Sequence, residues 1–295
     1  MRVGFELFQL ARAAGAGSIF VVGIGRDVGK TTTLRAIYAA AYEAGTQVGL
    51  ASIGRDGDRT LRSESRPKPR LWLRPGTIFV TARSSLPRTP AAEILELSRL
   101  QSSVGSLLYA RVAQSGFYEL VGPPTASGVH EIVAELGTRS ETVVIDGAVD
   151  RVAALAGSNG AIVVACGAGA AKTMPEAVDE IAALVARLRV PRFDPGVPSI
   201  ELEGALTAAQ AASLLATGET RQIVVRDPTQ IALSGRAGLR ALSQLTVRCK
   251  RPLRVIGATI ASIGPHRSFE PRDFAAAVAK ATSLPTFDVY AARAA

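Results

Sequence analysis

The sequence has few aromatic residues, few cysteines and no apolar run long enough to cross a membrane. Aromatic residues make up 5% of the 295 residues, so we expect a core of aliphatic side chains. The two cysteines, Cys166 and Cys249, match no metal-binding spacing, and so few thiols are typical of a reducing compartment. Glu6, Gln9 and Arg12 interrupt the N-terminal segment, which predicts an amphipathic helix and not a signal peptide. We therefore expect a cytoplasmic protein without a membrane span.

Charge is also sparse, at 20% of residues against 47% hydrophobic residues, which excludes disorder as the default state. The formal net charge is +9, and almost all of the positive charge is arginine. The arginines are scattered, with modest clusters at 62–74 and 248–254, and no aromatic residue interleaves with the second cluster. Nucleic acid is therefore not an expected partner, because charge alone gives only non-specific attraction. The sequence does not indicate an oligomeric state.

Apolar strands alternate with helical patterns along the whole chain, which predicts an α/β fold with a mainly parallel sheet. We expect three layers, with helices on both faces of the sheet. A linker at 192–197 divides the chain into a first domain, 1–191, and a C-terminal α/β half, 192–295, which can also continue the first sheet. The buried strands are predicted at 18–22, 48–53, 77–81, 142–145, 161–165, 222–225 and 253–260. The main helices are predicted at 30–44, 127–136, 175–188 and 271–281.

Two further elements are predicted from local signals alone. Thr89 followed by Pro90 is typical of a helix N-terminus. The triplet at 114–116, Gln-Ser-Gly, lies between two apolar runs and predicts a hairpin that pairs 107–112 with 117–121.

The most informative segment joins the first predicted strand to the first long helix. It has glycine-rich turn chemistry followed by Gly-Lys-Thr, with five residues between Gly23 and Gly29. Glycines allow successive backbone N–H groups to form an anion nest, and the helix N-terminus adds its positive dipole end. We therefore predict a phosphate-binding loop for a nucleoside triphosphate, made by Gly23, Gly25, Arg26, Asp27, Val28, Gly29, Lys30, Thr31 and Thr32. The alternative is an ordinary strand–turn–helix with a chance Gly-Lys-Thr.

The loop chemistry assigns individual roles. Lys30 is expected to contact the β- and γ-phosphates, and Thr31 to bind Mg²⁺. ATP is the expected nucleotide because the sequence contains no Asn-Lys-x-Asp guanine signature, although GTP is not excluded.

Acidic residues follow two other predicted strands. Asp146 follows the strand at 142–145 and is predicted to bind Mg²⁺ directly or through water. Asp56 and Asp58 follow the strand at 48–53, and either is a candidate to position water or the metal. Parallel strands place their carboxyl ends at one edge of the sheet, where ligands bind. Aspartate is also common in turns, and this alternative stays open for all three residues.

The loop resembles that of dethiobiotin synthetase, cobyric acid synthase and the MinD-like ATPases. The shared pattern is Gly-x-x-x-x-Val-Gly-Lys-Thr, which ends here at Thr31. This chain differs from MinD-like members at Gly25, where those proteins carry a second lysine. The resemblance implies a P-loop NTPase fold with bound ATP and Mg²⁺.

A looser resemblance extends over most of the chain, to accessory ATPases of cobalamin-dependent lysine and ornithine aminomutases. The matching pieces are short: 52–57, 68–69, 76–77, 81–82, 119–123, 146–148 and 287–289. The chain departs from the pattern at 259–262, where Thr-Ile-Ala-Ser replaces the expected Thr-Val-Asn-Pro. Such proteins use ATP to eject damaged cofactor from the mutase, which implies a partner enzyme.

Three functions fit these observations. The chain can be an ATPase that remodels or reactivates a partner enzyme, an ATP-dependent ligase or kinase acting on a small molecule, or a nucleotide-gated binding module. The first is favoured because the last hundred residues contain no catalytic motif. A ligase should consume ATP only with its substrate, whereas a module should bind ATP without hydrolysing it.

Overall fold

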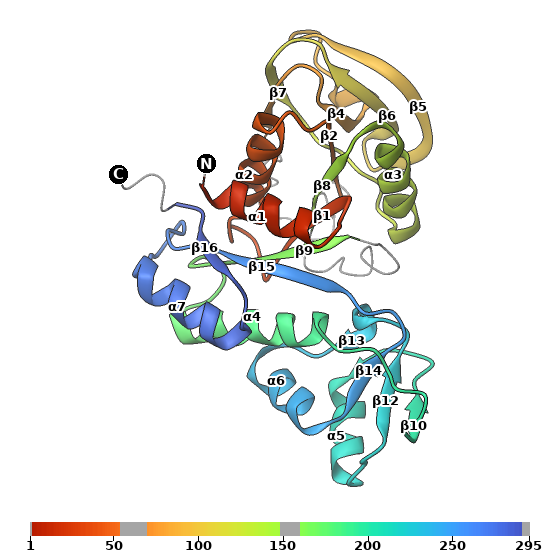
Figure 1. Ribbon diagram of the computed structural model, residues 1–295, viewed down its shortest axis with the longest axis vertical. Coiled ribbons are helices and arrows are strands. Elements are labelled where there is room, and N and C mark those ends of the chain that lie inside the picture. The colour runs from red at the N-terminus through yellow and green to blue at the C-terminus, as the bar shows by residue number, and fades with distance from the viewer. Residues whose placement is uncertain (1, 54–69, 148–159, 291–295) are drawn as a thin grey trace. The chain divides into compact units, whose positions relative to one another are not determined.

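The computed structural model describes residues 2–53, 70–147 and 160–290 of the chain. Asp56 and Asp58 therefore lie outside the described residues. Within the described part there are seven α-helices (Figure 1), α1 (Arg2–Ala13), α2 (Lys30–Glu43), α3 (Ala126–Arg139), α4 (Met174–Leu188), α5 (Ala208–Ala216), α6 (Gly235–Gln244) and α7 (Pro271–Thr282). The predicted N-terminal amphipathic helix is confirmed as α1.

The largest sheet in the described residues is mixed and mostly parallel, with nine strands in the order β16-β15-β9-β1-β8-β2-β4-β6-β5. Strand β2 pairs in parallel with β4 and β8, whereas β6 runs antiparallel to both of its neighbours, β4 and β5. The strands are β1 (Ser18–Gly23), β2 (Val48–Ser52), β4 (Ile78–Ala82), β5 (Ala92–Ser102), β6 (Gly105–Val112), β8 (Thr142–Asp146), β9 (Ala161–Gly167), β15 (Arg254–Ala261) and β16 (Thr286–Asp288). The predicted α/β class with a mainly parallel sheet is confirmed.

Each of two compact units is made of two separate segments of the chain. The first unit is Met1–Val21 with Thr31–Ala154, and the second is Val22–Lys30 with Leu155–Ala295. The candidate phosphate loop thus belongs to the same unit as the C-terminal part of the chain.

In the first unit, helices pack on opposite faces of the strands. Leu136 and Ser140, in and just after α3, are the nearest neighbours of Gly49 in β2. Tyr38 of α2 hydrogen bonds through its hydroxyl to Thr77 Oγ1, at 2.8 Å. Gly49 pairs in parallel with Ile78, so Gly49 and Thr77 face opposite sides of the sheet. The strands β1, β2 and β4 are buried at every residue, as expected for strands covered on both sides.

Two predicted elements in this unit are wrong. The segment after Thr89 is not a helix, because Ala92–Ser102 forms strand β5 along β6. The predicted hairpin is also absent from the described chain: β6 pairs with β4 and β5, and β7 (Gly116–Tyr118) pairs with β3 (Leu71–Leu73). After Thr89 the pairing of β5 with the next strand, β6, outweighs the helix signal, and at 116–118 pairing with the distant strand β3 outweighs the local hairpin signal.

The second unit combines three strands of the large sheet with two smaller parallel sheets and with helices. Strands β9, β15 and β16 are parallel neighbours, and α4 and α7 pack against them. A smaller sheet has the order β10-β12-β14, formed by β10 (Ser199–Glu201), β12 (Gln222–Val225) and β14 (Val247–Cys249). The short strands β11 (Leu206–Thr207) and β13 (Ile231–Ala232) pair beside it. Helices α5 and α6 accompany these strands in Figure 1, and an aliphatic core includes Ile223, Val225 and Leu245.

Local sequence explains where these helices begin. Thr173 caps α4 and Thr207 caps α5, and each forms a capping box with the residue three positions later. The threonine side chain accepts a backbone N–H in the first turn, and the side-chain oxygen of Glu176 or Gln210 accepts the backbone N–H of the cap residue.

Candidate functional site

The candidate phosphate loop begins where β1 ends and finishes at the first residue of α2. Asp27 and Gly29 have positive φ values of 53° and 87°, so the backbone reverses sharply before the helix. Val28 is buried to 1% exposure and anchors the loop, whereas Arg26 and Asp27 are exposed. The first turn of α2 contains no acidic residue. A helix N-terminus preceded by such a turn can accept an anion through its free N–H groups.

The side chain of Lys30 packs directly against the backbone of Gly23 inside the loop. A Cβ added at Gly23 would lie 2.6 Å from Val28 Cγ2 and 2.9 Å from Lys30 Cγ, so only glycine leaves room for both side chains. Lys30 folds back across the loop, and its ammonium group donates a hydrogen bond to the carbonyl oxygen of Gly25. The charge of Lys30 therefore lies over the same turn that presents the backbone N–H groups.

Residues far along the chain support the loop, and no sequence motif marks them. Ile24 N–H donates to Ala165 O in β9, at 3.2 Å. A Cβ on Gly167 would lie 2.7 Å from Val28 Cα, so the loop backbone rests directly on this glycine. The only sequence signal for this contact is that Gly167 and Gly169 follow a predicted buried strand, which is the position where glycine allows a close backbone approach.

The carboxyl ends of β15 and β16 also reach the loop. A Cβ on Gly29 would lie 3.1 Å from Ala261 Cβ and 3.3 Å from Val289 Cγ2. Asp288, next to Val289, is only 9% exposed. Its Oδ1 accepts the backbone N–H of Tyr290, and its Oδ2 has no hydrogen-bond partner among the described residues. A buried carboxylate oxygen at this edge of the sheet makes Asp288 a further candidate site residue, which no sequence motif indicated.

Asp146 and Thr31 belong to the first unit. Asp146 is the last residue of β8 and is aligned with Val21 on one side and Ser52 on the other. Its carbonyl oxygen accepts the N–H of Ile53 at 2.9 Å, and the N–H of Gly147 donates to Val21 O at 2.8 Å. The backbone thus fixes Asp146 between two parallel strands, at the carboxyl edge of the sheet. Thr31 and Thr32 are half-buried in the first turn of α2.

Neither cysteine is ionised at neutral pH. Burial raises the pKa of the Cys166 thiol to about 12 and that of Cys249 to about 11, so both remain protonated at neutral pH. Within residues 2–53, 70–147 and 160–290, no three His, Cys, Asp or Glu side chains are grouped as metal ligands. In the same residues, no helix has both the length and the apolar character needed to cross a bilayer.

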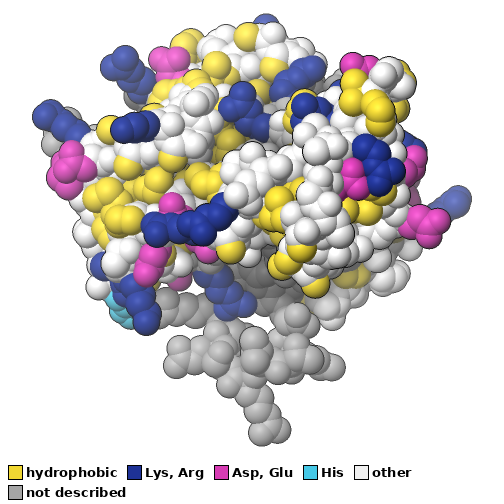
Figure 2. Space-filling model, turned by 90° about the horizontal axis from the view of Figure 1, so that it is seen from below, with side chains coloured by type: hydrophobic (Ala, Val, Ile, Leu, Met, Phe, Trp, Pro, Cys, Tyr) yellow, Lys and Arg dark blue, Asp and Glu magenta, His cyan; other side chains and the backbone are white. Residues whose placement is uncertain are grey.

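Positive charge does not gather into one continuous patch on the face shown in Figure 2. Lys and Arg side chains there are spread among hydrophobic and acidic ones.

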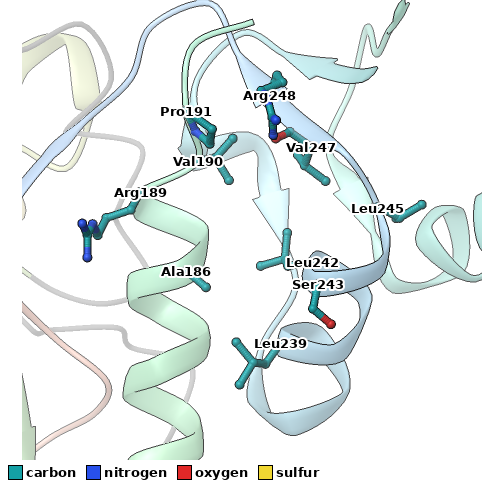
Figure 3. Close-up of a pocket in the computed structure, with 10 residues that line it drawn as sticks. All are labelled: Ala186, Arg189, Val190, Pro191, Leu239, Leu242, Ser243, Leu245, Val247 and Arg248. Atoms are coloured by element: carbon teal, nitrogen blue, oxygen red, sulfur yellow. The ribbon is translucent and has the colours of Figure 1, made fainter. Parts of the chain in front are cut away.

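The second unit also contains a cavity of about 220 Å³ between the end of α4 and α6 (Figure 3). Ala186, Val190, Leu239 and Leu242 contribute apolar atoms to its lining, whereas the side chain of Arg189 points away from them in Figure 3. No loop residue lines this cavity.

No model of a known protein family matches the chain, and no curated protein or solved structure matches it either.

Proposed function

We propose that the chain binds a nucleoside triphosphate with Mg²⁺, hydrolyses it, and uses this cycle to remodel or reactivate a partner enzyme. The observation that supports the proposal best is the strand–loop–helix junction at Gly23–Lys30. Two positive-φ residues turn the loop, and a lysine lies across it at the start of a helix that has no acidic residue in its first turn. These are the features by which P-loop NTPases bind polyphosphates.

The proposed roles follow from the chemistry of each group. Lys30 neutralises the β- and γ-phosphates, and the loop N–H groups bind their oxygens. Thr31 and Asp146 supply hydroxyl and carboxylate oxygens, which are the hard ligands that Mg²⁺ prefers, so this donor set fits the metal. Bound Mg²⁺ would supply charge stabilisation for phosphoryl transfer. Asp56 and Asp58 stay candidates for positioning water or the metal.

A role toward a partner enzyme is favoured over small-molecule chemistry by the C-terminal part of the chain. Its small sheet has its own core, and its buried Asp227 caps the short 3-10 helix Pro228–Gln230 and binds Arg226, so this carboxylate is engaged in local structure and not in acid–base chemistry. One observation favours the alternative, a dethiobiotin-synthetase-like ligase or kinase. The hydroxyl of Thr81, at the carboxyl end of β4, is fully buried and has no hydrogen-bond partner in the described chain, so it is a polar atom that a small substrate could engage.

The first experiment is titration of fluorescent ATP and GTP analogues, with and without Mg²⁺, into wild type and Lys30→Ala. We expect wild type to bind, with ATP preferred, and the variant to lose binding while keeping its thermal unfolding transition, because Lys30 acts on phosphate as a point charge. Equal affinity in the two proteins would contradict the proposal. Phosphate release without any added substrate would favour the partner-directed ATPase over the ligase.

A further inference from the structure

The small sheet of the second unit carries a group of basic residues at its carboxyl edge. Arg226 follows β12, and Lys250 and Arg251 follow β14. Backbone hydrogen bonds continue beyond the strand ends, from Lys250 N to Val225 O and from Arg251 N to Arg226 O, both at 3.0 Å. Arg192 forms a parallel bridge with Cys249 on the other side of β14. We refer to Arg192, Arg226, Lys250 and Arg251 as the basic edge.

Arg226 is held in place by a buried acid. Its Nε donates to Asp227 Oδ2 at 3.0 Å, and Asp227 is 0% exposed. Asp227 Oδ1 in turn accepts the backbone N–H of Thr229 at 3.0 Å, which fixes the carboxylate. The side chain of Arg226 is nevertheless 58% exposed. Because Nε is occupied, the guanidinium is oriented, and its terminal nitrogens are available to an anion from outside.

The other members of the basic edge carry more positive charge than nearby acidic side chains neutralise. Lys250 forms an ion pair with Glu201 at the end of β10. Arg192 and Arg251 are exposed, and neither has an acidic partner among the described residues. The carboxyl ends of parallel strands are where such sheets bind ligands, so the excess charge lies at an edge suited to recognition.

The surroundings favour an acidic protein segment over other anions. The cations are exposed and not enclosed in a cavity, which suits an extended partner better than a small phosphate compound. Glu201 lies on the same edge and would repel a continuous phosphate backbone. The segment 248–254 also offers no aromatic ring on which a base could stack.

We propose that the basic edge docks an acidic segment of the partner protein. This inference rests on the proposed partner-directed function for its biological role, but the binding itself needs no nucleotide and can be measured separately. Electrostatic complementarity of this kind mainly gives specificity and fast association, with affinity that falls as salt rises.

The test uses a fluorescein-labelled glutamate decamer, with a glutamine decamer as the uncharged probe, and fluorescence anisotropy at low and high salt. We expect wild type to bind the glutamate decamer, and Arg226→Gln/Arg251→Gln to bind it about tenfold more weakly, a loss typical of two exposed charge pairs. The control, Arg240→Gln/Arg272→Gln, removes two exposed arginines outside the basic edge and should bind nearly as wild type does.

A second double variant tests whether the loss of binding arises from unfolding after the Arg226–Asp227 ion pair is broken. Arg192→Gln/Arg251→Gln disturbs no ion pair in the described structure and should weaken binding to a similar extent. Equal losses in the control and in the edge variants would overturn the proposal, because binding would then depend only on net charge. Tighter binding of a single-stranded DNA decamer, lost in the same variants, would overturn it in favour of nucleic acid. Nucleotide titrations on the same variants should be unchanged, and a wild type that binds no nucleotide would defeat the proposed function without affecting this inference.

Discussion

The contact between Gly167 and the loop makes a specific prediction about a residue that has no phosphate chemistry of its own. Gly167→Ala adds one methyl group at the carboxyl end of β9. The φ of Gly167 lies outside the left-handed range, so alanine meets no backbone penalty there. The new Cβ would lie 2.7 Å from Val28 Cα and 3.2 Å from Asp27 O, and both of these are backbone atoms. A flexible side chain cannot relieve the clash, so the loop itself must move.

The size of the effect follows from ordinary contact distances. Non-bonded carbon atoms pack about 3.5–4.0 Å apart, so the loop must shift by about 1 Å. Overpacking of this kind typically destabilises a protein by about 1–3 kcal/mol. For a chain of this size, each kcal/mol lowers Tm by about 2–4 °C. A displacement of about 1 Å can lower the rate of a positioned reaction by about a hundredfold. We therefore expect about tenfold weaker nucleotide binding, a larger loss of hydrolysis and a modestly lower Tm.

The assay compares three glycine substitutions by nucleotide titration and thermal unfolding. Gly169→Ala would place its Cβ 3.3 Å from Asp27 O, a milder contact, so its loss should be smaller. Gly137→Ala in α3 meets nothing within 4 Å and should leave binding unchanged, with stability raised by up to about 1 kcal/mol. The reasoning fails if Gly167→Ala binds nucleotide as wild type does, or if Gly169→Ala is the weaker binder of the two.

Two further predictions concern single groups. Asp146→Asn should leave nucleotide binding measurable but lower phosphate release at least about tenfold, because metal placement is disturbed; wild-type turnover would remove Asp146 from the site. Cys166 and Cys249 should resist a thiol reagent at pH 8 until the protein unfolds, because burial raises their pKa values to about 12 and 11. Because these thiol pKa values are raised in the folded state, the stability that the protonated thiols contribute is complete below the ordinary thiol pKa of about 8.5 and is lost as pH rises through 11 and 12. Denaturant unfolding between pH 8 and 11 should therefore show a falling free energy of unfolding. A rise over this range would contradict the prediction.

The elements predictable from sequence are those whose signal is local. Ser18–Gly23 is a continuous apolar run bounded by glycine, and Lys30–Glu43 has a helical pattern ending before Gly45, so both were predicted to within one residue. Strand β12 was predicted with its observed ends, Gln222–Val225. Strand β5 could not be predicted in this way. Its outward residues Ile94 and Leu97 are 49% and 61% exposed, so neither burial nor a clean alternation marks it as a strand.

The same distinction applies to the candidate site. The loop is contiguous, and its motif is readable because glycine, lysine and threonine act at fixed spacing. Its supports are Gly167 and Ala261, which end β9 and β15, and Val289, which directly follows β16. Only the strand order, with β9, β15 and β16 as parallel neighbours, brings their carboxyl ends together. No residue type among them carries a chemical signature, so sequence reasoning had no basis for selecting them.

Helix α4 lies in the chain between the glycine that supports the loop and the first residue of the basic edge. It follows Gly167, on which the loop rests, and its end leads through Val190 and Pro191 to Arg192 of the basic edge. Its 15 residues span about 22 Å at 1.5 Å per residue, and the capping box at Thr173 fixes its first turn. Residues 168–173 join Gly167 to α4, so the loop support and the basic edge are connected along the chain through this helix. If nucleotide alters the affinity of the edge for an acidic segment, linkage requires that the segment alter nucleotide affinity by the same factor. Repeating each titration with the other ligand at saturation gives the two factors, and unequal factors would show that the two effects do not arise from one coupled equilibrium.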